Sequence, residues 1–149
     1  MLERLPAREE PIRVPKELAG EPGLFVVDAT WGTVNPVQLG KGVATIAELE
    51  LVEHLERGLR LVDTRSPDSF RQGTIPGAIN IPRREIARRV DELDPEAPTA
   101  FFCNGPQCPA TPSTIRELLG LGYPPEVILY YRGGTHDWVT LGFPIVPGT

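Results

Sequence analysis

Cysteine, histidine and long apolar runs are scarce in this chain of 149 residues. Only two cysteines and two histidines occur, too few for a disulfide scaffold or a structural zinc site. No apolar stretch is long enough to span a bilayer, and the first residues lack the apolar run of a signal peptide. We therefore expect a cytoplasmic protein with no membrane contact, no metal and no cofactor. Its cysteines are either reactive or simply buried.

A strongly basic surface is also absent. The 15 Lys and Arg residues are outnumbered by 20 Asp and Glu residues, which gives a net charge of -5. Nucleic-acid binding depends on clustered cations, so no nucleic-acid partner is expected. Met, Asn and Gln are scarce and Pro is abundant at 17 residues, a composition that resembles thermophile proteins.

The chain divides into an extension and one domain. Residues 1–42 are rich in Pro and charge, contain one strand-like run at 25–27, and are expected to pack on the domain. Residues 43–149 alternate strand-like apolar runs with helical patterns. This alternation predicts an α/β domain with three αβα layers and a mainly parallel central sheet.

Local signals place the elements of this domain. Thr45 and Glu48 form a capping-box pair for a first helix that ends at Gly58. Its expected buried stripe consists of four apolar residues, Ile46, Leu49, Val52 and Leu55. Strands are expected at 59–62, 78–81, 100–102 and 127–131, and further helices after Ser66, Pro82, Cys108 and Gly133.

The segment from Cys103 to Cys108 is the strongest candidate site. It follows a buried strand and precedes a helix start, the place where open α/β sheets bind ligands. Helix N-termini present unpaired N–H groups and the positive end of the helix dipole. A Cys103 thiolate would be stabilised there, so its pKa should fall. A buried core cysteine without chemistry is the alternative.

The loop also predicts a ring of backbone donors that binds anions. Pro106 and Pro109 have no amide proton. The remaining donors are the N–H groups of Asn104, Gly105, Gln107 and Cys108. We therefore expect the substrate to bind at five loop residues, Asn104, Gly105, Pro106, Gln107 and Cys108.

Several motifs resemble the rhodanese-like domain in order and spacing. They are Asp63-Thr64-Arg65, Phe70, the run Gly-Thr-Ile-Pro-Gly-Ala-Ile-Asn-Ile-Pro at 73–82, Cys103, and Arg132-Gly133-Gly134 with Trp138. The resemblance covers about residues 43–146. It implies a sulfurtransferase in which Cys103 is the catalytic cysteine, while Asp63 and Arg65 brace the loops around the site.

The resemblance implies a persulfide mechanism without a general base. The Cys103 thiolate attacks the outer sulfur of the donor, which is a small thiosulfate-like anion or a persulfide. The sulfur then passes to an acceptor, which is cyanide, a thiol or a thiol-bearing protein. His54 and His136 are expected to be packing or surface residues, since nothing in the sequence pairs them with Cys103.

The loop departs from the family pattern, which often reads Cys-x-x-Gly-x-Ser/Thr. Pro106 stands at the Gly position and Cys108 at the hydroxyl position. Pro106 stiffens the loop and removes one donor, which weakens the case for thiosulfate as the physiological donor. Thr74 replaces the usual His of the family, and little effect on activity is expected because that position is not the nucleophile.

Three other functions are considered. A phosphatase or arsenate reductase would need an Arg to close a Cys-x5-Arg loop, and Pro109 stands there. A non-catalytic interaction module usually lacks the cysteine. A dithiol redox protein would use Cys103 and Cys108, which could form a disulfide across the loop. In a redox-gated sulfur carrier, Cys108 would instead attack a Cys103 persulfide and expel sulfide as a disulfide forms. We favour an orientation in which Cys108 points away from Cys103.

Four arginines lie off the apolar stripe of the helix expected after Pro82. They are Arg83, Arg84, Arg88 and Arg89. A solvated helix face is favoured over a role in steering anions.

Overall fold

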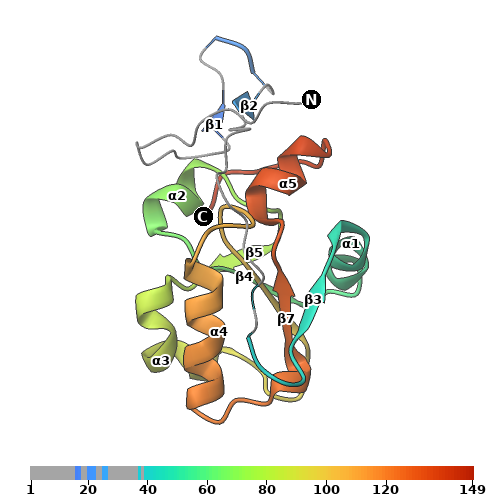
Figure 1. The fold of residues 1–149 in the computed structure, drawn as a ribbon. Helices are drawn as coiled ribbons and strands as arrows, with labels where there is room; N and C mark the ends of the chain where they lie inside the picture. Colours follow the sequence, from blue (N-terminus) through green and yellow to red (C-terminus); the bar gives the residue numbers. More distant parts are fainter. Residues whose placement is uncertain (1–15, 18–19, 23–24, 27–36, 38) are drawn as a thin grey trace, which may run out of the picture.

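A five-stranded parallel sheet lies at the centre of the computed structural model, which describes residues 16–17, 20–22, 25–26, 37 and 39–149 (Figure 1). Its strands are β3 (Ala44–Ile46), β4 (Arg60–Asp63), β5 (Ala78–Asn80), β6 (Thr99–Phe102) and β7 (Ile128–Tyr131). They lie side by side in the order β3-β7-β6-β4-β5, so β6 is central. Because all neighbours are parallel, every strand ends at the same edge of the sheet.

Helices cover both faces of this sheet (Figure 1). They are α1 (Glu48–Glu56), α2 (Pro67–Gln72), α3 (Ile86–Arg89), α4 (Ala110–Gly120) and α5 (Gly134–Thr140), with short 3-10 turns η1 (Arg83–Glu85), η2 (Val90–Glu92) and η3 (Pro125–Val127). Core residues of α3 and α4 pack on one face, and those of α1 and α5 pack on the other. The predicted three-layer αβα fold is confirmed.

Alternate strand residues divide the core into two halves, because successive side chains of a strand point to opposite faces. On β6, Phe101 belongs to the cluster under α3 and α4, whereas Phe102 belongs to the cluster under α1 and α5. Tyr130 and Tyr131 divide in the same way on β7. All four side chains are buried. The carboxyl ends of β6 and β7 are therefore packed against core residues on both faces of the sheet.

The start of the first helix differs from the prediction. Thr45 lies in β3, and the N-cap is Ala47, whose N–H donates to the Glu50 side chain at 3.3 Å. Leu49 is 74% exposed, while Leu51 is buried. The physical reason is that residues 44–46 pair with β7, so the helix begins later and presents a different face.

The starts of three other predicted helices can be compared with the structure. Ser66 caps α2 as predicted, with its Oγ accepting the Ser69 N–H at 3.2 Å. The helix expected after Cys108 is confirmed as α4, which begins at Ala110. The helix expected after Pro82 is instead divided into η1, α3 and η2.

The N-terminal residues are described only in part. Two short strands, β1 (Lys16–Glu17) and β2 (Phe25–Val26), pair antiparallel, and β2 falls within the strand predicted at 25–27. Val37 and Leu39 pack against the core. Residues 1–15, 18–19, 23–24, 27–36 and 38 of the extension predicted over 1–42 lie outside the described residues. Within the described residues, no helix is long and apolar enough to cross a membrane.

Candidate active site

The cysteine loop begins where the central strand ends. Cys103 directly follows β6, and Cys108 lies two residues before the start of α4. The first N–H groups of this 11-residue helix have no partner within the helix. Both thiols therefore lie at the predicted edge of the sheet, beside free backbone donors.

The two thiols interact with each other and divide these donors between them. Cys103 Sγ lies 3.5 Å from the carbonyl oxygen of Cys108, and the two thiols are joined by a hydrogen bond. Cys103 also accepts hydrogen bonds from the N–H and the hydroxyl of Thr111. The Cys108 sulfur accepts hydrogen bonds from the N–H groups of Ala110 and Asn104. Two sulfur atoms thus occupy one anion-binding site.

Burial decides which thiol carries the charge. Cys103 is 2% exposed, and this desolvation raises the pKa of its thiol. The hydrogen bond from Cys103 lowers the pKa of Cys108 to about 6, with help from backbone N–H groups and from the charge of Arg65. The prediction of a lowered Cys103 pKa is therefore wrong for the resting pair. Burial of Cys103 and the donors around Cys108 favour the negative charge on Cys108.

A turn within the loop corrects two further expectations. The Cys108 N–H is not a free donor, because it donates to the Gly105 carbonyl at 3.0 Å. Cys108 does not point away either, since its thiol bonds to that of Cys103. Asn104 does direct its N–H at a sulfur, as expected. Gln107 is half-buried on the turn.

Residues between β7 and α5 hold the carbonyl groups of the loop. The bonds are Thr135 N–H to Cys103 O (3.0 Å), His136 N–H to Asn104 O (2.8 Å) and Arg132 Nε to Pro106 O (3.0 Å). In a planar trans peptide the C=O and the following N–H point in opposite directions. Holding the Cys103 carbonyl toward Thr135 therefore turns the Asn104 N–H toward the Cys108 sulfur.

Gly134 permits this close approach of α5 to the loop. Its φ is +63°, and a Cβ there would lie 2.4 Å from the Cys103 carbonyl oxygen and 2.6 Å from the Gly105 nitrogen. Any larger residue would push the loop away. The Arg132-Gly133-Gly134 motif thus orients the loop from outside it.

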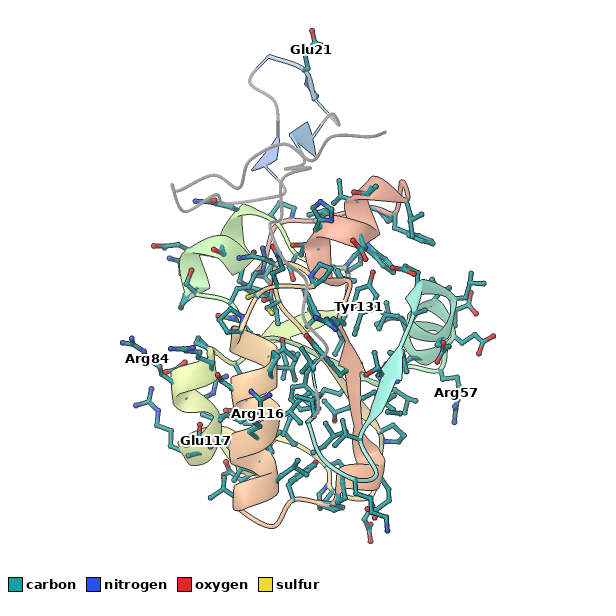
Figure 2. All side chains as sticks on the ribbon, in the orientation of Figure 1. Glu21, Arg57, Arg84, Arg116, Glu117 and Tyr131 are labelled. Carbon is teal, nitrogen blue, oxygen red and sulfur yellow. The ribbon has the colours of Figure 1, made fainter. Side chains whose placement is uncertain are left out.

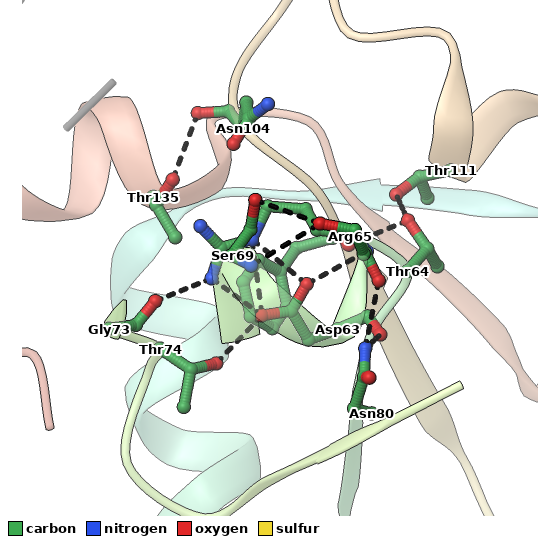
Figure 3. A network of polar contacts seen from close by, with 12 residues as sticks. Asp63, Thr64, Arg65, Ser69, Gly73, Thr74, Asn80, Asn104, Thr111 and Thr135 are labelled. Carbon is green, nitrogen blue, oxygen red and sulfur yellow. Dashed lines mark hydrogen bonds and ion pairs between the residues drawn. The ribbon is translucent and has the colours of Figure 1, made fainter. Parts of the chain in front are cut away.

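Asp63 and Arg65 form a buried ion pair at the end of β4 (Figure 3). Arg65 donates to both carboxylate oxygens at 2.7 to 3.1 Å and to the Gly73 carbonyl at 2.6 Å. Thr74 Oγ1 donates to the carboxylate at 2.8 Å, and Asn80 donates to the backbone carbonyls of both ion-pair residues. The ion pair is buried and joins the end of β4 to residues 73–74 and to Asn80 of β5.

A pair of buried hydroxyls links β4 to Cys103. Thr64 Oγ1 lies 3.0 Å from the Phe102 carbonyl, to which it donates, and 2.9 Å from Thr111 Oγ1. Thr111 in turn donates to Cys103. Thr111 was not among the residues predicted from the sequence. The available signal was a hydroxyl residue in the first turn of the helix that follows the cysteines.

A cavity of about 470 Å³ opens beside Cys108. Its wall includes Cys108, Arg65, Arg83 and Arg84, but not Cys103. Three arginines therefore line the same cavity as the half-buried Cys108. Cys103 is not on the cavity wall. This cavity is where a small anion would meet the pair.

The four arginines after Pro82 divide between two roles. Arg88 and Arg89 form ion pairs with Glu85 and Glu92 on the outer face, as predicted for a solvated helix. Arg84 also extends outward (Figure 2), yet it lines the cavity together with Arg83. The solvated-face prediction is therefore incomplete for these two residues, which begin η1.

The sequence model of the rhodanese-like domain matches residues 48–141, which contain the whole cysteine loop. The chain belongs to the rhodanese-like family. The motifs quoted from its sequence therefore identified the family correctly.

Relatives of this rhodanese-like domain carry different names. A curated HTH-type transcriptional regulator from Mycobacterium tuberculosis is 32% identical over 111 residues, which are 74% of this chain and 48% of that protein. A sulfurtransferase from Allochromatium vinosum is 31% identical over 86 residues, 58% of this chain and 77% of that protein. The solved thiosulfate sulfurtransferase from Pseudomonas aeruginosa has a TM-score of 0.61 and 28% identity, covering 72% of this chain and 21% of that one. The chain thus spans about half of the regulator and about a fifth of the solved enzyme.

Both histidines of this rhodanese-like domain have polar partners. His54 is buried in α1 with Nε2 2.7 Å from the Arg60 carbonyl, and burial lowers its pKa. The expected packing role is confirmed for His54. His136 Nδ1 lies 2.9 Å from Asp137. Among the residues that the structure describes, no group of three or more His, Cys, Asp or Glu side chains could hold a metal ion.

Proposed function

We propose that this rhodanese-like domain is a sulfurtransferase that carries sulfane sulfur on Cys103. The observation that carries the proposal is the position of the Cys103 sulfur at the end of the central strand. There it accepts the N–H and the hydroxyl of Thr111 and contacts a second thiol. Donors of this kind stabilise a thiolate and then a persulfide anion. The relatives named as sulfurtransferases support the same chemistry.

The thiol pair supplies both the nucleophile and the proton acceptor. In the resting pair Cys108 holds the negative charge and Cys103 the proton. As Cys103 attacks the outer sulfur of the donor, its proton passes to Cys108. The S–S bond of the donor breaks, and sulfite or a thiolate leaves with the electron pair. Thr111 then directs its hydroxyl to the substituted sulfur.

The cavity beside Cys108 would receive the donor. Arg65, Arg83 and Arg84 line it, so a small sulfur anion is the favoured class of donor. In the second step the outer sulfur of the persulfide passes to cyanide, a thiol or a thiol-bearing protein. A reducing cytoplasmic setting would keep both cysteines free for this cycle.

Intact-mass measurement with peptide mapping tests the proposal. Cys108→Ser leaves Cys103 as the one thiol of the loop, so the adduct is measured in this variant. After exposure to thiosulfate or an alkyl persulfide at alkaline pH, Cys108→Ser should gain the mass of one sulfur atom, on Cys103. The matched control Cys103→Ala, which keeps the other thiol, should gain none. Sulfur bound by Cys103→Ala, or no adduct in Cys108→Ser with any sulfane donor, would overturn the proposal.

A further inference from the structure

We propose that Cys108 is a resolving thiol that attacks the inner sulfur of a Cys103 persulfide, forms a Cys103–Cys108 disulfide and releases the outer sulfur as hydrosulfide. This inference rests on the proposed persulfide at Cys103. It adds a product, sulfide, and a co-substrate, an external thiol or dithiol that reduces the disulfide. Cys108 is thereby a catalytic residue and not a replacement for a hydroxyl.

The contact between the thiols supports this step. The turn closed by the Cys108 N–H and the Gly105 carbonyl, at 3.0 Å, brings the second thiol back to the first. The loop is held in this form from outside by Thr135, His136 and Arg132. A nucleophile kept at the reacting atom has a high effective concentration. Cys108 therefore has an advantage over any acceptor that must diffuse in.

Leaving groups decide which sulfur atom Cys108 attacks. Attack on the outer sulfur would expel the Cys103 thiolate into a site where burial raises the pKa of that thiol. Attack on the inner sulfur expels hydrosulfide instead. Exchange at sulfur is faster when the leaving group is the weaker base, so disulfide formation is favoured over transfer of the sulfur to Cys108.

The cavity gives hydrosulfide a way out. Cys108 lies on its wall with Arg65, Arg83 and Arg84, whereas Cys103 does not. An anion released from the inner thiol is drawn toward these three cations. The disulfide that remains presents its Cys108 sulfur to the same cavity, where an external thiol reaches it.

Atoms and electrons balance in this step. A bond forms between the two cysteine sulfurs, and the bond between Cys103 Sγ and the outer sulfur breaks. The proton that Cys108 took up during loading passes to the outer sulfur of the persulfide anion, and this sulfur leaves with the electron pair of the broken bond as hydrosulfide. The sulfane sulfur is reduced by two electrons, and each cysteine sulfur is oxidised by one. No external oxidant is required.

The test follows labelled sulfur in the wild type and in Cys108→Ser, without oxygen and without added thiol. Thiosulfate labelled in its outer sulfur is used, or a labelled alkyl persulfide if that loads Cys108→Ser better. Wild type should release one labelled sulfide per chain and lose two hydrogens, with residues 103 and 108 crosslinked in peptide mapping. Cys108→Ser should keep its label, with an adduct that persists at least about tenfold longer.

The outcomes separate this inference from the proposed function. If Cys108→Ser holds the label and wild type holds it equally long without a crosslink, Cys108 is not a resolving thiol, while the persulfide carrier stands. If Cys108→Ser and Cys108→Ala take up no label even at alkaline pH and wild type releases no labelled sulfide, although all three are folded by circular dichroism, both ideas fail. Wild type kept without a sulfur donor is the control and must keep both thiols reduced. A Cys103–Cys108 crosslink in this control would come from direct oxidation of the thiols and not from a persulfide.

Discussion

The Asp63 network and the cysteine loop both lie at the carboxyl ends of the strands, but their charged groups are paired differently. Around Asp63 every charge has a fixed partner, since the carboxylate bonds to Arg65 and Thr74 within a buried network. In the cysteine loop one negative charge is shared between two sulfur atoms, and it lies on Cys108 at rest. The ion pair of the first region keeps one arrangement of charges. In the second region a proton can move between the Cys103 and Cys108 sulfur atoms.

The largest expected effect follows from breaking the first region. Asp63→Ala leaves the buried Arg65 guanidinium unpaired, which should lower the free energy of unfolding by about 3–5 kcal/mol. The exposed pair of Asp68 and Arg71 is the matched control, since Asp68→Ala should cost less than about 1 kcal/mol. Urea denaturation measures both. Equal costs for the two variants would contradict the contrast between the regions.

The Asp63 region was largely predictable from sequence. Asp63 and Arg65 follow an apolar strand, so parallel topology alone places them at the same edge as Cys103. Thr74, which stands where the family commonly has His, donates its hydroxyl to Asp63. A local pattern and the rule that parallel strands end together were sufficient here.

The cysteine loop was predictable in position but not in charge. Pro109 and the apolar strand before Cys103 located the loop and the helix start. Which sulfur ionises depends on burial and on the turn from Gly105 to Cys108, which long-range bonds from residues 132–136 hold in place. For a similar reason β3 was missed. Ile46 fits both a helix stripe and a strand, and only pairing with β7 decides between them.

An intermediate effect is expected from the hydroxyl that donates to Cys103. Thr111→Val removes one hydrogen bond to a charged sulfur, a loss of about 1.5–3 kcal/mol, and should slow sulfur loading roughly tenfold to a hundredfold. Thr114→Val is the control, because that hydroxyl on the same helix is buried without a hydrogen-bond partner. Single-turnover loading followed by mass spectrometry gives the rates. Equal rates in the two variants would remove Thr111 from the site.

The most direct test of the shared charge is the pH dependence of sulfur loading in wild type and Cys108→Ser. Because the pKa of Cys108 is lowered to about 6, the thiolate is present above that pH and is lost as the pH falls through it. Wild-type loading should therefore rise across pH 6 and level off. In Cys108→Ser the rate should keep rising to alkaline pH, since burial raises the pKa of Cys103 and no partner thiol takes its proton. In Cys108→Ser the sulfur should map to Cys103, whereas wild type releases it as sulfide, so loading of wild type is followed by the sulfite set free from thiosulfate. Superimposable pH profiles, or sulfur bound first at Cys108, would contradict the account.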